Sequence, residues 1–146
     1  MVDSAWDIPK ALKHSWPTYE VTKTEDDCIL YALGIGFSKK AMDATHYRYT
    51  YENDENFAPF PTIPVVIGHG GDLGAGDMDI PGMPKFNPMS LLHGEESVTF
   101  IKPIEPNTKY NVTDRVSDIQ DKVKGALLVV DGEIKNAETG ELVCIV

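Results

Sequence analysis

The sequence lacks several features that would place it in a common class of protein. Its 146 residues include only two cysteines, Cys28 and Cys144, and neither has a histidine or a second cysteine at metal-ligand spacing. Basic residues are also scarce, because 13 Lys and Arg oppose 23 Asp and Glu, for a formal net charge of −10. Nucleic acids and anionic membranes attract basic surfaces, so we expect neither as a partner. No stretch approaches the roughly 20 apolar residues that span a bilayer. Residues 1–10 contain no apolar core of a secretory signal, which favours a reducing intracellular compartment.

The residues that are present fit a single globular domain. Hydrophobic residues make up 42% of the chain and charged residues 25%, which is enough apolar material for a core. Thr24, followed by three acidic residues, predicts a capped and largely buried helix over residues 25–34, which Gly34-Ile35-Gly36 would end. Alternating tyrosines predict a strand over residues 46–51.

Proline and glycine are concentrated between residues 59 and 88, which hold six of the ten prolines and six of the twelve glycines. A proline inside a helix costs about 3 kcal/mol, so only a short turn over residues 62–67, with Pro64 in its first turn, is expected there. After His93 the hydrophobic period changes to two. The predicted strands are residues 97–104, 109–120, 125–135 and 141–146. Short connections join them, so the sequence predicts an α+β fold with an antiparallel meander.

His93 and Gly94 lie directly before the first of these strands and form the strongest candidate site. A His-Gly step at a strand end offers an imidazole and exposed backbone N–H groups to a polar ligand. The competing interpretation is a histidine that is merely satisfied at a strand end. Lys122 and Lys124 flank a tight turn, where they would meet phosphate oxygens as point charges or remain simple exposed lysines.

Other motifs carry less weight. Residues 71–77 are rich in glycine but lack the strand, helix and terminal Lys-Ser/Thr of a phosphate loop. Their spacing of Asp72 from Asp77 also fails the EF-hand pattern, so a solvated turn is the preferred interpretation. His69 is interpreted as a loop residue. No nucleophile elbow is present, and the sequence predicts neither a metal nor a cofactor.

An ordered set of short stretches resembles the N-terminal half of 2-enoyl-CoA hydratase 2. This is the hydratase unit of peroxisomal multifunctional enzyme type 2, in the MaoC-like hot-dog superfamily. The matching stretches are Leu30-Tyr31-Ala32-Leu33-Gly34-Ile35-Gly36, Tyr49-Thr50-Tyr51-Glu52, Phe60-Pro61-Thr62-Ile63-Pro64-Val65-Val66-Ile67-Gly68, Ile80-Pro81-Gly82, Leu91-Leu92-His93-Gly94-Glu95 and Lys102-Pro103-Ile104. The resemblance spans roughly residues 24–146, so residues 1–23 are expected to be a lead-in segment before one hot-dog domain.

The resemblance implies a hot-dog fold with a shortened or missing central helix. It also implies hydration of a trans-2-enoyl-CoA to the (3R)-3-hydroxyacyl-CoA, with coenzyme A as part of the substrate rather than a separate cofactor. Family members carry their catalytic Asp and His in a second hot-dog half, within a Gly-Asp-x-Asn-Pro-x-His motif. In this sequence Gly71-Asp72 is followed by Leu73-Gly74, so Asp72 and His93 are not expected to be that pair. His93 and Gly94 match the substrate-contacting His-Gly, and Lys122 matches a lysine that contacts CoA; Lys124 is a possible substitute.

The preferred function is therefore the acyl-CoA-binding half of an R-specific enoyl-CoA hydratase in fatty-acid β-oxidation, inactive alone. The expected partners are an acyl-CoA, the C-terminal half of the same protein and a second copy in a homodimer, and the expected location is the peroxisome. The chain ends in an apolar strand at residues 141–146, which favours a protein that continues. The rival hypothesis is a non-catalytic hot-dog module for dimerisation or acyl-CoA binding. A hot-dog thioesterase ranks third, because nothing here supplies its acid or base.

Overall fold

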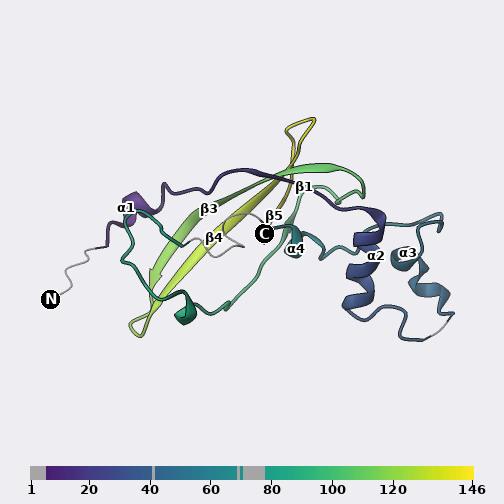
Figure 1. Cartoon of the computed structure of the whole chain (residues 1–146), viewed down its shortest axis with the longest axis horizontal. Helices are drawn as coiled ribbons and strands as arrows, with labels where there is room; N and C mark the ends of the chain where they lie inside the picture. The colour runs from purple at the N-terminus through teal and green to yellow at the C-terminus, as the bar shows by residue number, and fades with distance from the viewer. Residues whose placement is uncertain (1–5, 41, 69, 71–77) are drawn as a thin grey trace.

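The computed structural model describes residues 6–40, 42–68, 70 and 78–146. In chain order its elements are α1 (Ile8–Ala11), β1 (Tyr19–Thr22), α2 (Glu25–Gly34), the 3-10 turn η1 (Ala44–His46), α3 (Tyr47–Thr50), α4 (Pro64–Gly68), the 3-10 turn η2 (Pro88–Ser90), β2 (Thr99–Phe100), β3 (Lys109–Asp121), β4 (Ala126–Asn136) and β5 (Leu142–Ile145). The molecule is elongated, with α2 and α3 together at one end and α1 toward the other (Figure 1).

Five antiparallel strands form one sheet, in the order β1-β3-β4-β5-β2. The long hairpin of β3 and β4 is its centre, with a bulge between Val116 and Asp118 that bends β3. The expected strands are confirmed for β3, β4 and β5. The short helical turn expected over residues 62–67 is present as α4, which begins two residues later than expected, at Pro64. An antiparallel sheet with one five-residue helix against it is the hot-dog arrangement with a shortened central helix.

The predicted meander is wrong at its first strand. β2 is two residues long instead of eight, and it pairs with β5 at the far edge of the sheet rather than with β3. Pro103 and Pro106 lie in the connection to β3 and cannot donate backbone hydrogen bonds to a hairpin ladder. The edge of β3 is instead occupied by β1, which the hydrophobic pattern did not reveal. The sheet therefore includes residues that the expected boundary at residue 24 had assigned to the lead-in segment.

Helix α2 begins and ends where the sequence predicted. Thr24 and Asp27 form a capping box, in which each side chain accepts the other residue's backbone N–H. At the other end, Gly36 has φ +105°, and the N–H of Phe37 donates to the carbonyl of Ala32, which closes a Schellman motif. The prediction that this helix is largely buried is wrong. Only two of its residues are buried, whereas Leu30 is 66% exposed.

The predicted strand over residues 46–51 is also wrong, because these residues form η1 and α3. The tyrosine alternation fitted a strand, but the rings pack on one another locally. Tyr47 and Tyr51 meet edge-on one helical turn apart, and Tyr49 meets Phe37 in the same geometry. Aromatic packing within this helical segment replaces the cross-strand contacts that a strand would need.

The core lies between the inner face of the sheet and the short helices. Its main cluster joins Cys28 of α2 and Ile67 of α4 to Val112 and Ile134 of the central strands. Full burial of a side chain such as Ile134 stabilises the fold by roughly 1.5–3 kcal/mol. A second cluster joins Ala11 and Trp16 to Val116 in the far half of the hairpin. Within the described ranges, no helix has both the length and the apolar character that a membrane span requires.

Candidate functional site

His93 and Gly94 lie on an exposed segment between η2 and β2, which Figure 1 shows as an unpaired green trace. The His93 side chain is 63% exposed, and its Nε2 atom is 2.6 Å from Oε2 of Glu96. At that distance the imidazole donates to the carboxylate, which fixes the ring orientation. No heavy atom lies within 4 Å of the position that a Cβ on Gly94 would occupy. The expected His-Gly step is thus open to a ligand, with the imidazole already oriented.

The second predicted element, Lys122, lies in the exposed turn between β3 and β4. The N–H of Lys122 donates to the carbonyl of Gly125 at 2.9 Å, and that of Val123 donates to Oδ1 of Asp121 at 2.7 Å. Val123 is 95% exposed at φ +68°, which is a costly conformation for a β-branched residue. The turn holds Lys122 and Lys124 on either side of this valine.

A cleft of about 280 Å3 begins at the strand that follows His93-Gly94. Phe100 of β2 and Ile104 of the connection to β3 line one part of it, and Phe60 and Ile63 of the proline-rich segment line another. Two of the lining residues are cationic. Arg48 lies over the Tyr49 ring, with its guanidinium carbon 5.5 Å from the ring centroid, and Lys102 forms a 2.6 Å ion pair with Glu141. A mostly apolar lining with two cations suits an apolar chain attached to an anionic group.

Half-buried Tyr19 and buried Asp114 interact electrostatically within the sheet. The Tyr19 hydroxyl donates to the carbonyl of Ile67 at 3.0 Å and accepts the N–H of Gly70 at 3.1 Å. Burial and the nearby Asp114 carboxylate together raise the pKa of Tyr19 to about 12, although the Gly70 N–H acts in the opposite direction. Asp114 is 1% exposed. The two hydrogen bonds of Tyr19 hold the end of α4 against β1, and neither residue was predicted from the sequence. The sequence does contain a signal for this site, because Asp114 is an acidic residue at a position of β3 where the alternation otherwise places apolar residues.

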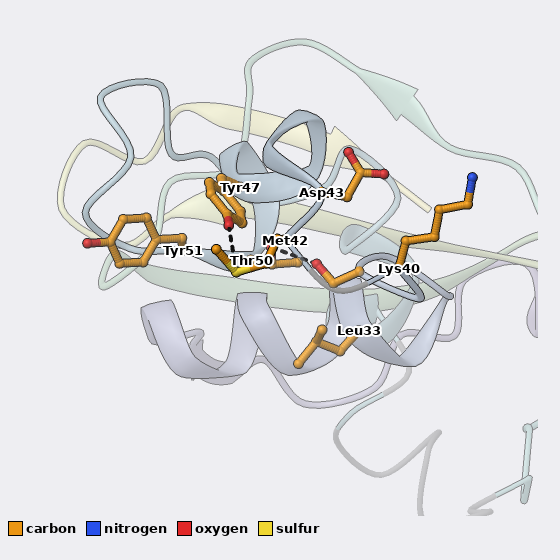
Figure 2. Close-up of a pocket in the computed structure, with 8 residues that line it drawn as sticks. Leu33, Lys40, Met42, Asp43, Tyr47, Thr50 and Tyr51 are labelled. Carbon is orange, nitrogen blue, oxygen red and sulfur yellow. Dashed lines mark hydrogen bonds between the residues drawn. The ribbon is translucent and has the colours of Figure 1, made fainter.

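A second and larger cavity of about 530 Å3 lies between the C-terminal end of α2 and the η1–α3 segment. Figure 2 shows Leu33 on one side, Tyr47 and Tyr51 on the other, and Met42 between them. None of these side chains was predicted to be a site residue, because Tyr47 and Tyr51 were assigned to a strand.

Two predicted features lie outside the described residues, namely the loop interpretation of His69 and the solvated-turn interpretation of residues 71–77 with Asp72. Both cysteines are buried in the core and carry free thiols, whose pKa values are raised by burial. In the portion of the chain that is described, no cluster of three or more His, Cys, Asp or Glu side chains is placed to hold a metal ion.

The sheet and its short helix define the class of protein, a MaoC-like hot-dog domain. The solved MaoC-like dehydratase from Phytophthora capsici superposes with a TM-score of 0.79 at 30% identity, covering 95% of this chain and 47% of that one. The family model described as the MFE-2 hydratase 2 N-terminal domain matches residues 19–146, so the chain belongs to this family. The resemblance stated from the sequence is confirmed.

Two curated relatives place this domain within longer proteins. The chain is 31% identical over 124 residues to "Probable enoyl-CoA hydratase 2" of Dictyostelium discoideum, covering 85% of this chain and 40% of that protein. It is 30% identical over 134 residues to "Peroxisomal multifunctional enzyme type 2" of Mus musculus, covering 92% of this chain and 18% of that protein. The chain therefore spans less than half the length of these relatives.

Proposed function

We propose that this chain is the acyl-CoA-binding half of an R-specific 2-enoyl-CoA hydratase that acts in fatty-acid β-oxidation in the peroxisome. The single observation that carries the proposal is the family match over residues 19–146, to a model of the N-terminal domain of hydratase 2. The lengths of the relatives support the idea of a half, because the chain covers 40% or less of the two curated proteins described above. The proposed partners are a C-terminal hot-dog half and a second copy of the whole unit.

In this proposal the acyl chain occupies the cleft of about 280 Å3 that Phe60, Ile63 and Phe100 line. His93 and Gly94 contact the substrate near the mouth of that cleft, where an oriented imidazole and an unobstructed backbone are available. Lys122, with Lys124 as its neighbour, meets the phosphates of CoA from the β3–β4 turn. Apolar burial supplies affinity, and the polar contacts fix the position of the thioester.

The chemistry of hydration requires groups that we assign to the second half. A carboxylate and an imidazole there would take a proton from water as its oxygen adds to C3 of the enoyl thioester. This addition leaves enolate charge on the thioester oxygen, which backbone donors would stabilise. A proton added at C2 then completes the reaction. This chain contributes binding and orientation. His93, which is predicted to contact the substrate and not to act as an acid or a base, is paired with Glu96 at an exposed position.

The test measures hydration of trans-2-decenoyl-CoA by the 146-residue chain alone and by the chain combined with its C-terminal half, with chiral analysis of the product. Activity only in the combined protein, and only (3R) product, would support the proposal. Activity of the short chain alone would overturn it and return attention to His93 and Asp72.

A binding measurement separates the proposal from its rival. Decanoyl-CoA should bind the chain alone, and His93→Ala or the double substitution Lys122→Gln/Lys124→Gln should each weaken it. Lys109→Gln is the matched control. Lys109 is also an exposed lysine, but it lies at the other end of β3 from Lys122, where it pairs with Glu20 of β1. Binding without activity in any combined form would favour a non-catalytic hot-dog module.

A further inference from the structure

The cavity of about 530 Å3 beside α2 shares no lining residue with the cleft of about 280 Å3, and it includes none of His93, Gly94, Lys122 and Lys124. The lining residues are Leu33, Ser38, Lys40, Met42, Asp43, Tyr47, Thr50 and Tyr51. Apolar and aromatic side chains supply most of the wall, and a few polar groups converge on it. Its volume and lining match those of small-molecule sites, which are concave, mostly apolar and lightly provided with polar groups.

The loop that closes this cavity is held in a costly conformation. Ser38 and Met42 both have a left-handed backbone conformation, with φ of +54° and +60°, although neither is a glycine. Hydrogen bonds fix the loop, because the N–H of Ser38 donates to Nδ1 of His46 at 2.9 Å and its hydroxyl lies 3.1 Å from that of Thr50. Strained residues of this kind persist only where their surroundings hold them, and they gather at ligand clamps. The cavity is therefore built in advance.

Two charged residues line the cavity, and they differ in what they already bind. Asp43 accepts the N–H and the hydroxyl of Thr45 at 3.2 and 2.6 Å, and these bonds lower its pKa. Its carboxylate also lies 3.9 Å from Nδ1 of His46. By contrast, no described residue forms an ion pair or hydrogen bond with the Lys40 ammonium. Lys40 is thus a cation at the edge of an apolar cavity, with its charge available to an incoming anion.

The positions of the lining residues indicate an elongated ligand with one charged end. In Figure 2 Lys40 and Tyr51 lie at opposite ends of the cavity, with Met42 and Leu33 between them. Met42 is 86% exposed and Leu33 is 45% exposed, so a chain laid along them would remove apolar surface from water. We propose that this cavity binds a medium-chain alkyl carboxylate, whose chain lies on Leu33, Met42 and the two tyrosines and whose carboxylate pairs with Lys40. This proposal does not rest on the hydratase function.

The first test is a titration of the chain with decanoate, observed through ¹³C-methyl methionine signals. Met89 is an internal control, because it is 87% exposed but lies on η2, away from the cavity residues. We expect decanoate to shift the Met42 signal, which the Met42→Leu variant assigns, and to leave the Met89 signal in place. Equal shifts at both methionines would reveal nonspecific association of the alkyl chain and would overturn the proposal.

The second test isolates the charge. Lys40→Gln should weaken decanoate about two- to fivefold, as expected for one exposed ion pair, without changing the affinity for decanol. Lys39→Gln is the matched control, because the Lys39 stem lies against Gly36 and does not line the cavity. Asp43→Asn keeps the cap and removes a negative charge, so it should tighten decanoate binding.

Decanoyl-CoA distinguishes the two sources of an alkyl chain. Tighter binding of decanoyl-CoA than of decanoate at Met42, unaffected by Lys40→Gln, would overturn the carboxylate assignment and give the cavity to the thioester. Equal affinities of decanoate and decanol would overturn it as well. Neither result would bear on hydration by the combined protein, so the two proposals fail independently.

Discussion

Replacing Gly132 with alanine tests how tightly the sheet packs around its buried acid. Gly132 lies opposite Asp114 in the β3–β4 ladder, and a Cβ built on it would lie 2.9 Å from Oδ1 of Asp114. Ordinary van der Waals contact begins near 3.4 Å, and Asp114 is 1% exposed, so the carboxylate has little room to move away. Overpacking of this kind costs about 1–3 kcal/mol. The lower entropy of the unfolded chain returns about 0.4–1 kcal/mol, so we expect Gly132→Ala to lower the free energy of unfolding by about 1–2 kcal/mol.

Urea denaturation followed by circular dichroism measures this change, with Gly34→Ala as the matched control. Gly34 is helical, and a Cβ on it would meet nothing within 4 Å, so this variant should gain up to about 1 kcal/mol. A cycle with Asp114→Ala isolates the clash, because the Gly132 substitution should cost less once the carboxylate is gone. Unchanged stability of Gly132→Ala, with the expected gain at Gly34, would refute the packing argument. So would an equal loss in the presence and absence of the Asp114 side chain.

Two further predictions concern pH and helix capping. Because the pKa of Tyr19 is raised to about 12, its stabilising effect is complete below pH 10 and is lost as the pH rises from 10 to 12. For this half-buried group the loss should be about 1–2 kcal/mol after allowance for solvent screening, and Tyr19→Phe should flatten that part of an alkaline unfolding curve. Thr24→Ala breaks the capping box of α2 and should cost about 1 kcal/mol in urea denaturation. The backbone N–H and the hydroxyl of Thr24 both lower the pKa of Asp27, and the substitution removes only the hydroxyl. The cost of Thr24→Ala should therefore become smaller as the pH falls through the folded-state pKa of Asp27, but it should not vanish, because the Thr24 hydroxyl still accepts the Asp27 N–H.

The features predicted correctly are those that local chemistry determines. The capping residue, the acids of the first turn and the glycine that ends α2 all lie within 13 residues, and each satisfies a group of the same helix. Pro64 sets the start of α4 in the same way. The long strand β3 was predictable because every second residue from Tyr110 to Val116 is buried, and β4 because apolar residues fill its first half.

The features that were missed depend on contacts between distant segments. β1 is four residues long, and it is a strand only because Tyr19 to Thr22 pair with residues about 90 positions later. β2 likewise is a strand because it pairs with β5, more than 40 residues later in the chain, and not with β3, the next strand in sequence. The cavity beside α2 is lined by Tyr47 and Tyr51 of the helical segment around α3, which an alternating pattern cannot distinguish from a strand. The candidate residues Lys122 and His93 were selected by residue type, and neither motif encodes how the two lie relative to each other in space.

The exposed apolar residues before His93 lead to a last prediction, which depends on the proposed second half. Met89 and Leu92 are both 87% exposed, a large apolar surface for a segment that also carries the candidate site. If the C-terminal half covers this segment, Leu92→Gln should leave the stability of the chain alone within about 0.5 kcal/mol, yet weaken association with that half. Leu30→Gln is the matched control, because Leu30 is 66% exposed on α2, at the end of the molecule that Figure 1 shows beyond the sheet. Sedimentation of the chain mixed with its C-terminal half measures the association. Equal weakening by both substitutions would contradict the assignment of this surface, because general loss of hydrophobicity would then explain the effect.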